Sequence, residues 1–215
     1  MMLRKSLGAF VALTWLVAPV SALGEPIPFK LLKNYSRATF KSDAILETFV
    51  GNTAAEGVDG TLTVDPANPQ SVAATVKVDM NTVRTGIDKR DADMRGNNFL
   101  NTEVEANRWV TFEVTGVEIA GPLEPGKAIP AKVKGILTVK QKPVERVVDA
   151  TITYIKLTAE QVEQQKRFGF ASDNIKVRAK FLTTFTDHGM QVPQLLFFKV
   201  NNEIQLETDL TFVKQ

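Results

Sequence analysis

Residues 85–99 hold the densest set of side chains in this chain that could do chemistry. Their sequence, TGIDKRDADMRGNNF, places three acidic and three basic residues within eleven positions and ends on an aromatic residue. Such a set could bind a cation, supply two carboxylates for acid–base catalysis, or fix the course of the chain through ion pairs. Each possibility makes different demands on the neighbouring residues.

A calcium site is the first possibility. Asp91, Asp93 and Gly96 resemble the opening of a calcium-binding loop, which requires an oxygen ligand at its fifth position and a bidentate Glu at its twelfth. Arg95 and Thr102 occupy those two positions, and a cation at the fifth would repel the metal. Transition metals lack ligands because the chain has no Cys and a single His. We therefore expect no metal and no other cofactor.

Catalysis is the second possibility. His188 is the only imidazole in the chain, and its surroundings, TDHG, are typical of a turn, so we expect an exposed histidine rather than a general base. Two carboxylate pairs, Asp91 with Asp93 and Glu103 with Glu105, could do glycosidase chemistry. Lys and Arg flank both pairs, and such neighbours lower carboxylate pKa values where a general acid needs a raised one. The sequence therefore does not predict an enzyme.

The elements that must position these residues are strands. Val72, Ala74, Val76, Val78 and Met80 alternate with more polar residues, which is typical of a strand with one buried face. The same alternation runs through residues 131–139, 175–185 and 204–212, and residues 37–42, 60–64, 109–117 and 147–155 are further strand candidates.

Short connections join these strands. Turn-forming residues at 65–69 and 121–126 separate successive strands. At least eight strands in this order predict an antiparallel sandwich or a closed up-and-down barrel.

One helix interrupts the strands. Thr158 can cap residues 159–168, Gln161 completes a capping box, and Gly169 ends the helix. Because that helix is polar, we expect this insertion, residues 158–169, outside the barrel.

The inward faces of the strands are apolar. A barrel of eight strands either fills its interior with side chains or holds one small ligand, and for an all-β pattern alone a packed core is the simpler interpretation. Strand phase predicts these lining residues: Phe40, Leu62, Val76, Val78, Phe112, Val114, Leu137, Ile152, Val177, Phe181, Phe185, Leu206 and Phe212.

The charged segment is then best interpreted as a clasp. Arg90, Asp91 and Arg95 can pair with one another and with backbone groups, fixing the segment against the mouth of the barrel. The functional alternative is a polar rim, in which the same three residues meet the head group of a ligand whose tail lies inside.

The first residues have the three-part layout of a secretory signal peptide. Arg4 and Lys5 precede an apolar run over residues 7–17, and small residues follow at Val20 and Ala22. We predict a signal peptide over residues 1–22, with Gly24 as a second choice of cleavage site, and a single domain over residues 23–215. The absence of Cys excludes a lipobox anchor and disulfides. The expected product is a periplasmic or secreted soluble protein without stable membrane insertion.

Charge excludes nucleic acid as a partner. The whole chain carries a formal charge of +2, and the predicted signal peptide contains two basic residues and no acidic one. The mature chain is therefore neutral, with interspersed charges, whereas nucleic-acid binding requires clustered Lys and Arg. A homodimer is one assembly that the sequence leaves open.

Several motifs together resemble the YceI-like family, the lipid- or polyisoprenoid-binding, lipocalin-like barrels that bacteria export. The strongest is Thr85-Gly86, Arg90-Asp91, Met94-Arg95 and Phe99, which follows the family pattern T-G-x-x-x-R-D-x-H-L-[RK]-x-x-x-F-F. Supporting motifs lie at residues 36–40, 110–112, 133–139 and 187–190. The resemblance implies an eight-stranded antiparallel barrel with a long hydrophobic channel, and it makes a ligand cavity the preferred interpretation.

The chain departs from the family pattern at the polar end. Asp93 stands where His is usual, Leu100 replaces the second Phe, and residues 42–47 lack the family's histidine near the first strand. Those positions are expected beside a ligand head group, so the preferred head group is the property that these departures affect most.

The resulting hypothesis is a non-catalytic carrier or scavenger. Its barrel would hold a hydrophobic lipid: a polyisoprenoid, an isoprenoid quinone or a fatty amide. The alternative is a structural or interaction protein of the cell envelope with a filled barrel, whose contacts would be residues 159–168 and 193–198. An enzyme is the third hypothesis.

Overall fold

The structure is a computed structural model that describes residues 24–195 and 198–215. The predicted signal peptide, residues 1–22, lies outside the described residues. In the described part of the chain, no helix has both the length and the apolar character that crossing a membrane requires.

Strands dominate the structure. In the predicted strand over residues 131–139, Ala131, Gly135 and Leu137 are buried, whereas Lys132 and Lys134 are exposed. Residues 48–53 alternate in the same way, although no strand was predicted there. The strands are β1 (Ile27–Leu31), β2 (Arg37–Asp43), β3 (Thr48–Thr53), β4 (Val58–Asp65), β5 (Asn68–Asp79), β6 (Val83–Arg84), β7 (Trp109–Ile119), β8 (Ala128–Val139), β9 (Lys142–Lys156), β10 (Asp173–Thr184), β11 (Gln194–Leu195), β12 (Phe198–Lys199) and β13 (Glu203–Lys214).

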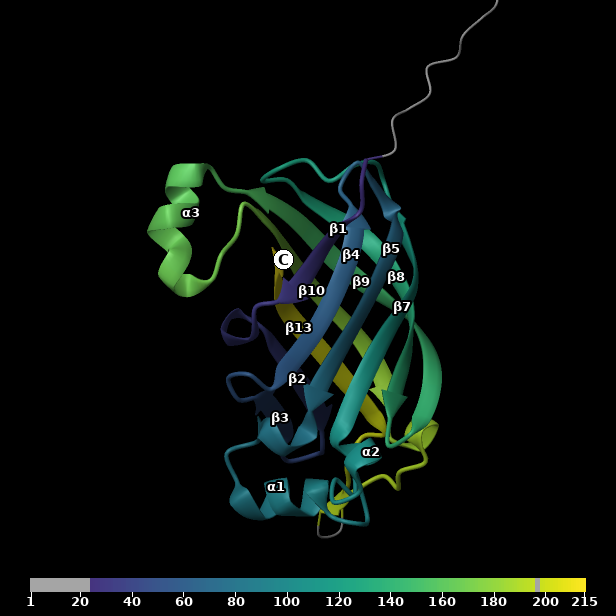
Figure 1. The fold of residues 1–215 in the computed structure, drawn as a ribbon. Helices are drawn as coiled ribbons and strands as arrows, with labels where there is room; N and C mark the ends of the chain where they lie inside the picture. Colours follow the sequence, from purple (N-terminus) through teal and green to yellow (C-terminus); the bar gives the residue numbers. More distant parts are fainter. Residues whose placement is uncertain (1–23, 196–197) are drawn as a thin grey trace, which may run out of the picture.

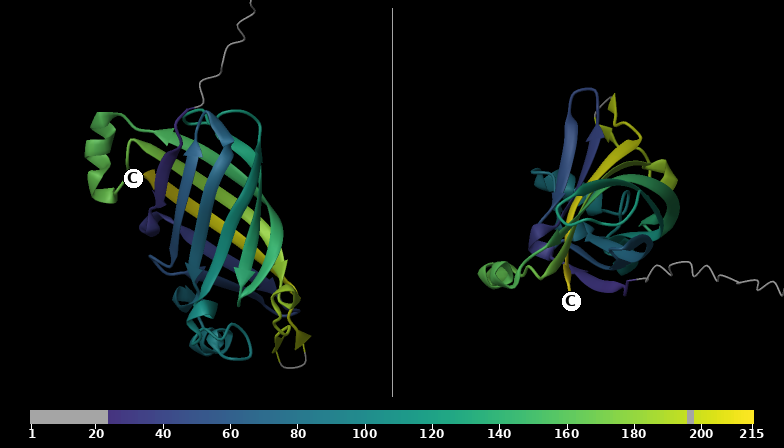
Figure 2. Two further views of the ribbon diagram at one scale, coloured as in Figure 1. Left: turned by 45° about the vertical axis from the view of Figure 1, so that its right-hand side comes forward. Right: turned by 90° about the horizontal axis from the view of Figure 1, so that it is seen from above.

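Eight of these strands form a closed antiparallel barrel. The hydrogen-bonded order is β1-β4-β5-β7-β8-β9-β10-β13, and β13 returns to β1 through three residue pairs, from Phe29 opposite Lys214 to Leu31 opposite Phe212. The closed ring is visible from the side in Figure 1 and from above in Figure 2. The predicted eight-stranded antiparallel barrel is confirmed.

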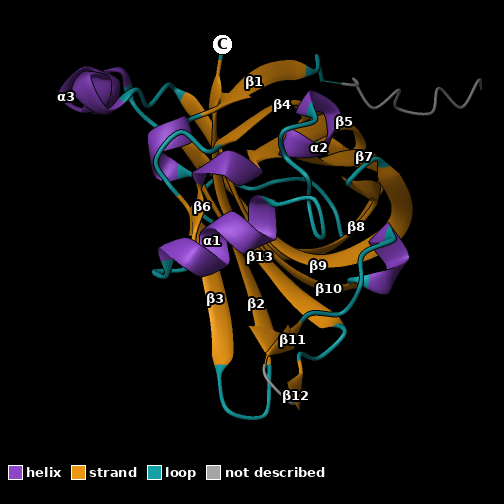
Figure 3. Cartoon of the chain, turned by 90° about the horizontal axis from the view of Figure 1, so that it is seen from below, coloured by secondary structure: helices purple, strands orange, loops and turns teal. Residues whose placement is uncertain are grey.

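A second group of strands widens one end of the barrel. The long strand β13 pairs with β1 near its carboxyl end, and the earlier residues Gln205–Asp209 pair with β2. β3 follows β2, and the two-residue strand β6 pairs with β3. The hairpin of β2 and β3 extends away from the ring, beside β11 and β12, in the view from below (Figure 3).

Helices lie at the two ends of the barrel. α1 (Asp88–Arg95) and α2 (Glu105–Arg108) lie at one end, and α3 (Ala159–Gln165), continued by the 3-10 turn Lys166–Phe168, stands away from the wall near the other (Figure 1). Further 3-10 turns are η1 (Lys33–Tyr35), η2 (Met80–Thr82) and η4 (Thr186–His188).

The predicted helical insertion has the expected ends. The Thr158 hydroxyl accepts from the Gln161 backbone N–H at 3.2 Å, and the Gln161 side chain accepts from the Thr158 N–H at 2.9 Å, which completes the capping box. Gly169 follows in the left-handed conformation, with φ of 82°, and ends the helical segment. Both predictions are confirmed.

Two apolar clusters fill the ends of the interior. At the α3 end, Phe29, Ile175 and Phe212 belong to a cluster of buried residues from most strands of the ring. At the α1 end, Leu100, Leu137, Val139 and Met190 form a smaller buried cluster with partly buried aromatic and methionine side chains around it. The two clusters lie toward opposite ends of a space that runs along the barrel.

Candidate functional site

The barrel encloses a cavity of about 620 Å³. This volume lies within the range typical of sites for small organic molecules, which are about 300–1,000 Å³. All thirteen residues that strand phase predicted as lining do line it: Phe40, Leu62, Val76, Val78, Phe112, Val114, Leu137, Ile152, Val177, Phe181, Phe185, Leu206 and Phe212. That they contact a ligand stays a prediction.

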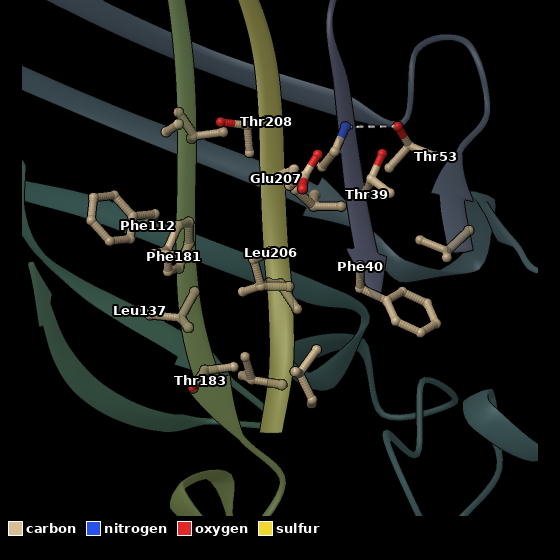
Figure 4. A pocket seen from close by; sticks show the side chains of 18 of the residues that line it. Thr39, Phe40, Thr53, Phe112, Leu137, Phe181, Thr183, Leu206, Glu207 and Thr208 are labelled. Atoms are coloured by element: carbon tan, nitrogen blue, oxygen red, sulfur yellow. Dashed lines mark hydrogen bonds between the residues drawn. The ribbon is translucent and has the colours of Figure 1, made fainter. Parts of the chain in front are cut away.

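The lining side chains leave space between them. Ten of the thirteen are partly exposed although they point inward, and only Leu62, Leu137 and Phe212 are buried. A tightly packed core would bury nearly all of them. Figure 4 shows Phe112, Phe181 and Leu206 among the side chains around this space. The interior is therefore a cavity with an apolar wall, in contrast to the filled barrel of the alternative hypothesis.

Glycines give two aromatic rings room to lie against the wall. Gly51 is directly opposite Phe40 in the β2–β3 pair, and a Cβ atom at Gly51 would lie 2.1 Å from Phe40 Cε1. A Cβ atom at Gly135 would likewise lie 2.5 Å from Phe112 Cε1. Phe112 in turn contacts Phe181, with ring centroids 5.8 Å apart. Each glycine therefore leaves the space beside its strand that a ring occupies.

Strand phase missed lining residues at the α1 end. Met94, Phe99, Leu100 and Met190 all line the cavity. They come from α1, turns and loops, where a period of two does not apply. The available signal was the presence of isolated apolar residues, Met94 and Phe99, in an otherwise polar segment. Met80, which the alternation did place on the apolar face, lines the cavity as well.

One strand changes phase within its length. β7 contains a bulge between Val114 and Gly116, so the inward positions shift from Phe112 and Val114 to Val117. Uniform alternation, which sequence reasoning assumed, does not hold beyond Val114.

Charged residues are found where the cavity meets α1. Arg90 lines the cavity and donates to Glu47 Oε1 at 2.7 Å and to Thr85 Oγ1 at 3.0 Å. Its guanidinium carbon lies 4.8 Å from the centroid of the Phe49 ring. Arg90 thus pairs with Glu47 and not with Asp91, the partner that the sequence suggested. Instead, Arg90 connects α1 to the turn between β2 and β3.

The other two residues of the predicted rim do not line the cavity. Asp91 is 1% exposed, and its Oδ1 accepts from the Thr85 backbone N–H at 2.9 Å and from the Thr85 hydroxyl at 2.6 Å. Arg95 donates to the Val83 carbonyl at 3.2 Å. Both therefore fix the backbone at residues 83–85. The predicted clasp exists, but its members bind the chain and not one another.

His188 is buried, not exposed as the turn pattern indicated. It is 1% exposed, with Nδ1 at 3.1 Å from the Lys142 carbonyl and Nε2 at 2.7 Å from Thr183 Oγ1. The Lys142 carbonyl can only accept, so Nδ1 carries the imidazole proton, and Nε2 of the neutral ring accepts from the Thr183 hydroxyl. Burial is the main cause of the lowered pKa of His188. The ring is a neutral part of the wall with both nitrogens hydrogen-bonded.

Other ionisable clusters support the barrel. The pKa of Asp79 is lowered mainly by its hydrogen bond with Arg108, whose Nη2 lies 2.6 Å from Asp79 Oδ2. Burial and the hydrogen bond to Asp173 raise the pKa of Tyr154 at the α3 end. Among the described residues, no three His, Cys, Asp or Glu side chains gather as metal ligands would. What this arrangement offers chemically is an apolar container with a few charged side chains at the α1 end.

Several solved structures have a similar fold. A structure of BcnA from Burkholderia cenocepacia has a TM-score of 0.60 and 15% identity, and covers 82% of this chain and 95% of its own. A polyisoprenoid binding domain from Saccharophagus degradans has a TM-score of 0.61 and 14% identity, covering 88% and 99%. The YceI protein of Campylobacter jejuni has a TM-score of 0.57 and 14% identity, covering 100% and 99%.

Sequence comparison extends this result. No curated protein matches the chain. The family model of the YceI-like domain, however, matches residues 29–212, from the first strand of the ring to the last. The motif at residues 85–99 and nearly all of the strands around the cavity fall within that match. The chain belongs to the YceI-like family.

Proposed function

We propose that the protein carries or sequesters a hydrophobic lipid in its barrel. The observation that carries the proposal is the apolar cavity of about 620 Å³ inside the ring of strands. A polyisoprenoid, an isoprenoid quinone or a fatty amide has the long, apolar tail that such a space fits. One similar structure, from Saccharophagus degradans, is described as a polyisoprenoid binding domain, which supports this choice.

Elementary energetics support binding without catalysis. Each methylene group moved from water into an apolar site contributes roughly 0.8 kcal/mol. A wall of Val, Leu and Phe therefore provides affinity through burial alone, and the proposal assigns no catalytic residue. The thirteen lining residues are the proposed contacts of the tail, and Arg90 is the proposed polar contact near the head group.

Export is the second part of the proposal. The layout of residues 1–22 supports secretion to the periplasm, where a lipid needs a soluble carrier to leave a membrane. Expression of the full chain in a bacterium, followed by osmotic release and mass measurement of the released protein, tests this part. A periplasmic product that begins at Leu23 is expected, and an uncleaved product in the cytoplasm would contradict it.

Organic extraction tests the bound lipid. Protein purified from its native compartment would be extracted with solvent and the extract analysed by mass spectrometry, with a heat-denatured and washed aliquot as control. We expect one lipid near equimolar amount. Calorimetric titration is the second readout. It is preferable to quenching of tryptophan fluorescence, because the neighbouring Val110 lines the cavity but Trp109 does not.

A matched pair of variants locates the bound lipid. Ala179 lines the cavity and is partly exposed to it, so Ala179→Trp should fill the space and abolish co-purification of the lipid. Val147 lies on the outer face of β9 and is 57% exposed, so Val147→Trp adds the same ring outside the barrel. Equal lipid loss in both variants, or none in either, would contradict binding in the cavity.

A further inference from the structure

Five of the described residues that line the cavity carry a formal charge. They are Glu47, Lys89, Arg90, Asp93 and Glu207. Each has a partner of opposite charge: Arg90 with Glu47 at 2.7 Å, Lys89 with Asp93 at 3.1 Å, and Glu207 with Lys180 at 3.0 Å. The charged part of the cavity wall is therefore balanced pair by pair.

The pair of Arg90 and Glu47 differs from the other two in burial. The Arg90 side chain is 24% exposed and Glu47 is 40% exposed, whereas the side chains of the other two pairs are 50–84% exposed. Solvent screens exposed pairs, so they influence a bound molecule little. Of the cations that line the cavity, Arg90 is therefore the one whose charge solvent screens least from a bound head group.

Existing contacts already occupy that guanidinium. Nη1 donates to Glu47, Nε donates to the Thr85 hydroxyl, and the group lies over the Phe49 ring. A phosphate or carboxylate could use Arg90 only by displacing Glu47 or by lying beside its carboxylate. The first loses a charge-assisted hydrogen bond, and the second brings two negative charges together.

We infer that Glu47 is a specificity-determining residue of this cavity: by neutralising Arg90, it selects lipids with uncharged head groups over lipids with anionic ones. This inference rests on the proposed function. An uncharged head group, such as a hydroxyl, an amide or a quinone carbonyl, needs only one hydrogen-bond donor or acceptor. It can therefore bind while Arg90 and Glu47 remain paired. An anionic head needs an unopposed cation, because an unpaired charge is costly to move out of water.

Two probes with the same tail test the inference. Farnesol and farnesyl phosphate would be titrated into delipidated full-length mature protein by calorimetry, at low and moderate ionic strength. We expect the wild type to bind the alcohol at least about tenfold more tightly than the phosphate. Equal affinities, or a preference for the phosphate, would overturn the inference.

Glu47→Gln tests the residue itself. Gln keeps the length of the side chain and can still accept from Arg90, but it leaves one positive charge unopposed. We expect phosphate affinity to rise by about tenfold at low salt and by less as salt increases, with alcohol affinity unchanged. Asp149→Asn is the matched control, because Asp149 pairs with Lys132 on the outer wall and does not line the cavity. It removes the same charge and should change neither affinity.

The double variant Glu47→Gln/Arg90→Gln separates local from general effects. If the gain in affinity for farnesyl phosphate depends on Arg90, the double variant should lose that gain. A gain that persists without Arg90, or that Asp149→Asn reproduces, would overturn the inference. If the wild type binds neither probe while its circular dichroism spectrum remains that of a folded barrel, the proposed function fails, and the inference fails with it.

Discussion

Single side chains decide how the polar end of the barrel is built. Asp91 is the buried residue of α1, and it reaches back to the N–H and hydroxyl groups of Thr85. Arg90, the adjacent residue, donates to the same Thr85 hydroxyl and also to Glu47. Asp91 therefore fixes the backbone from a buried position, while Arg90 lines the cavity and connects two segments of the chain.

The first prediction concerns Asp91. Replacing it with Ala leaves the partly buried Thr85 N–H and hydroxyl without their acceptor, which should lower the free energy of unfolding by about 2 kcal/mol. The matched change is Asp93→Ala, which breaks only an exposed pair with Lys89 and should cost less than about 0.5 kcal/mol. Urea denaturation measures both. Similar losses for the two variants would contradict the structural role of Asp91.

The second prediction concerns His188, whose pKa burial lowers from its ordinary value of 6.5. As the pH falls through that value, the unfolded chain takes up a proton before the folded chain does. The free energy of unfolding should therefore be highest above about pH 7 and fall as the pH drops toward 5.5, by at most about 1.4 kcal/mol per pH unit.

The matched comparison is His188→Asn. The chain has one histidine, so no other imidazole contributes to this window. Urea midpoints at pH 7.5 and 5.5 should differ for the wild type and nearly coincide for the variant. A pH dependence that survives the substitution would assign the effect to another group.

At the scale of elements, cross-strand pairs shape the cavity more than single strands do. The alternation of β5 or β10 can be read along the sequence, and it correctly placed Val76, Val78, Val177 and Phe181 on the cavity side. The pairing of Phe40 with Gly51 joins two strands, and periodicity along one strand does not reveal it. The same limit applies to Glu47 and Arg90, which are 43 residues apart.

The third prediction tests that pairing. Gly51→Val should force the Phe40 ring off the wall and into the cavity, because its Cβ would lie 2.1 Å from Phe40 Cε1. We expect a loss of lipid affinity of about tenfold or more with the barrel still folded. Gly116→Ala is the control, since nothing lies within 4 Å of a Cβ atom there and its affinity should not change. Calorimetry with farnesol measures both, and unchanged affinity in Gly51→Val would contradict the proposed role of the glycine.

At the scale of the whole molecule, the ring explains why the fold was predictable while parts of the site were not. Alternation along each strand gives that strand one buried face. When eight such strands close into a ring, these faces all point to the same interior. Closure also brings distant segments together, including the buried surroundings of His188, whose ring contacts Lys142 and Thr183. A local turn pattern predicted exposure there because it contains no information about β9.

The last prediction follows from an open interior. Because the cavity exists only in the folded ring, a lipid that binds there binds the folded state alone and must stabilise it. At a free concentration about one hundred times its Kd, the gain is about 2.7 kcal/mol, which corresponds to a rise in Tm of roughly 5–10 °C for a chain of this size. Delipidated protein should therefore melt earlier than the protein as purified, and added farnesol should restore the difference. Ala179→Trp, with its cavity filled, should melt at one temperature with or without farnesol. A Tm that rises equally in this variant would place the lipid outside the barrel, because surface adsorption does not depend on the space inside.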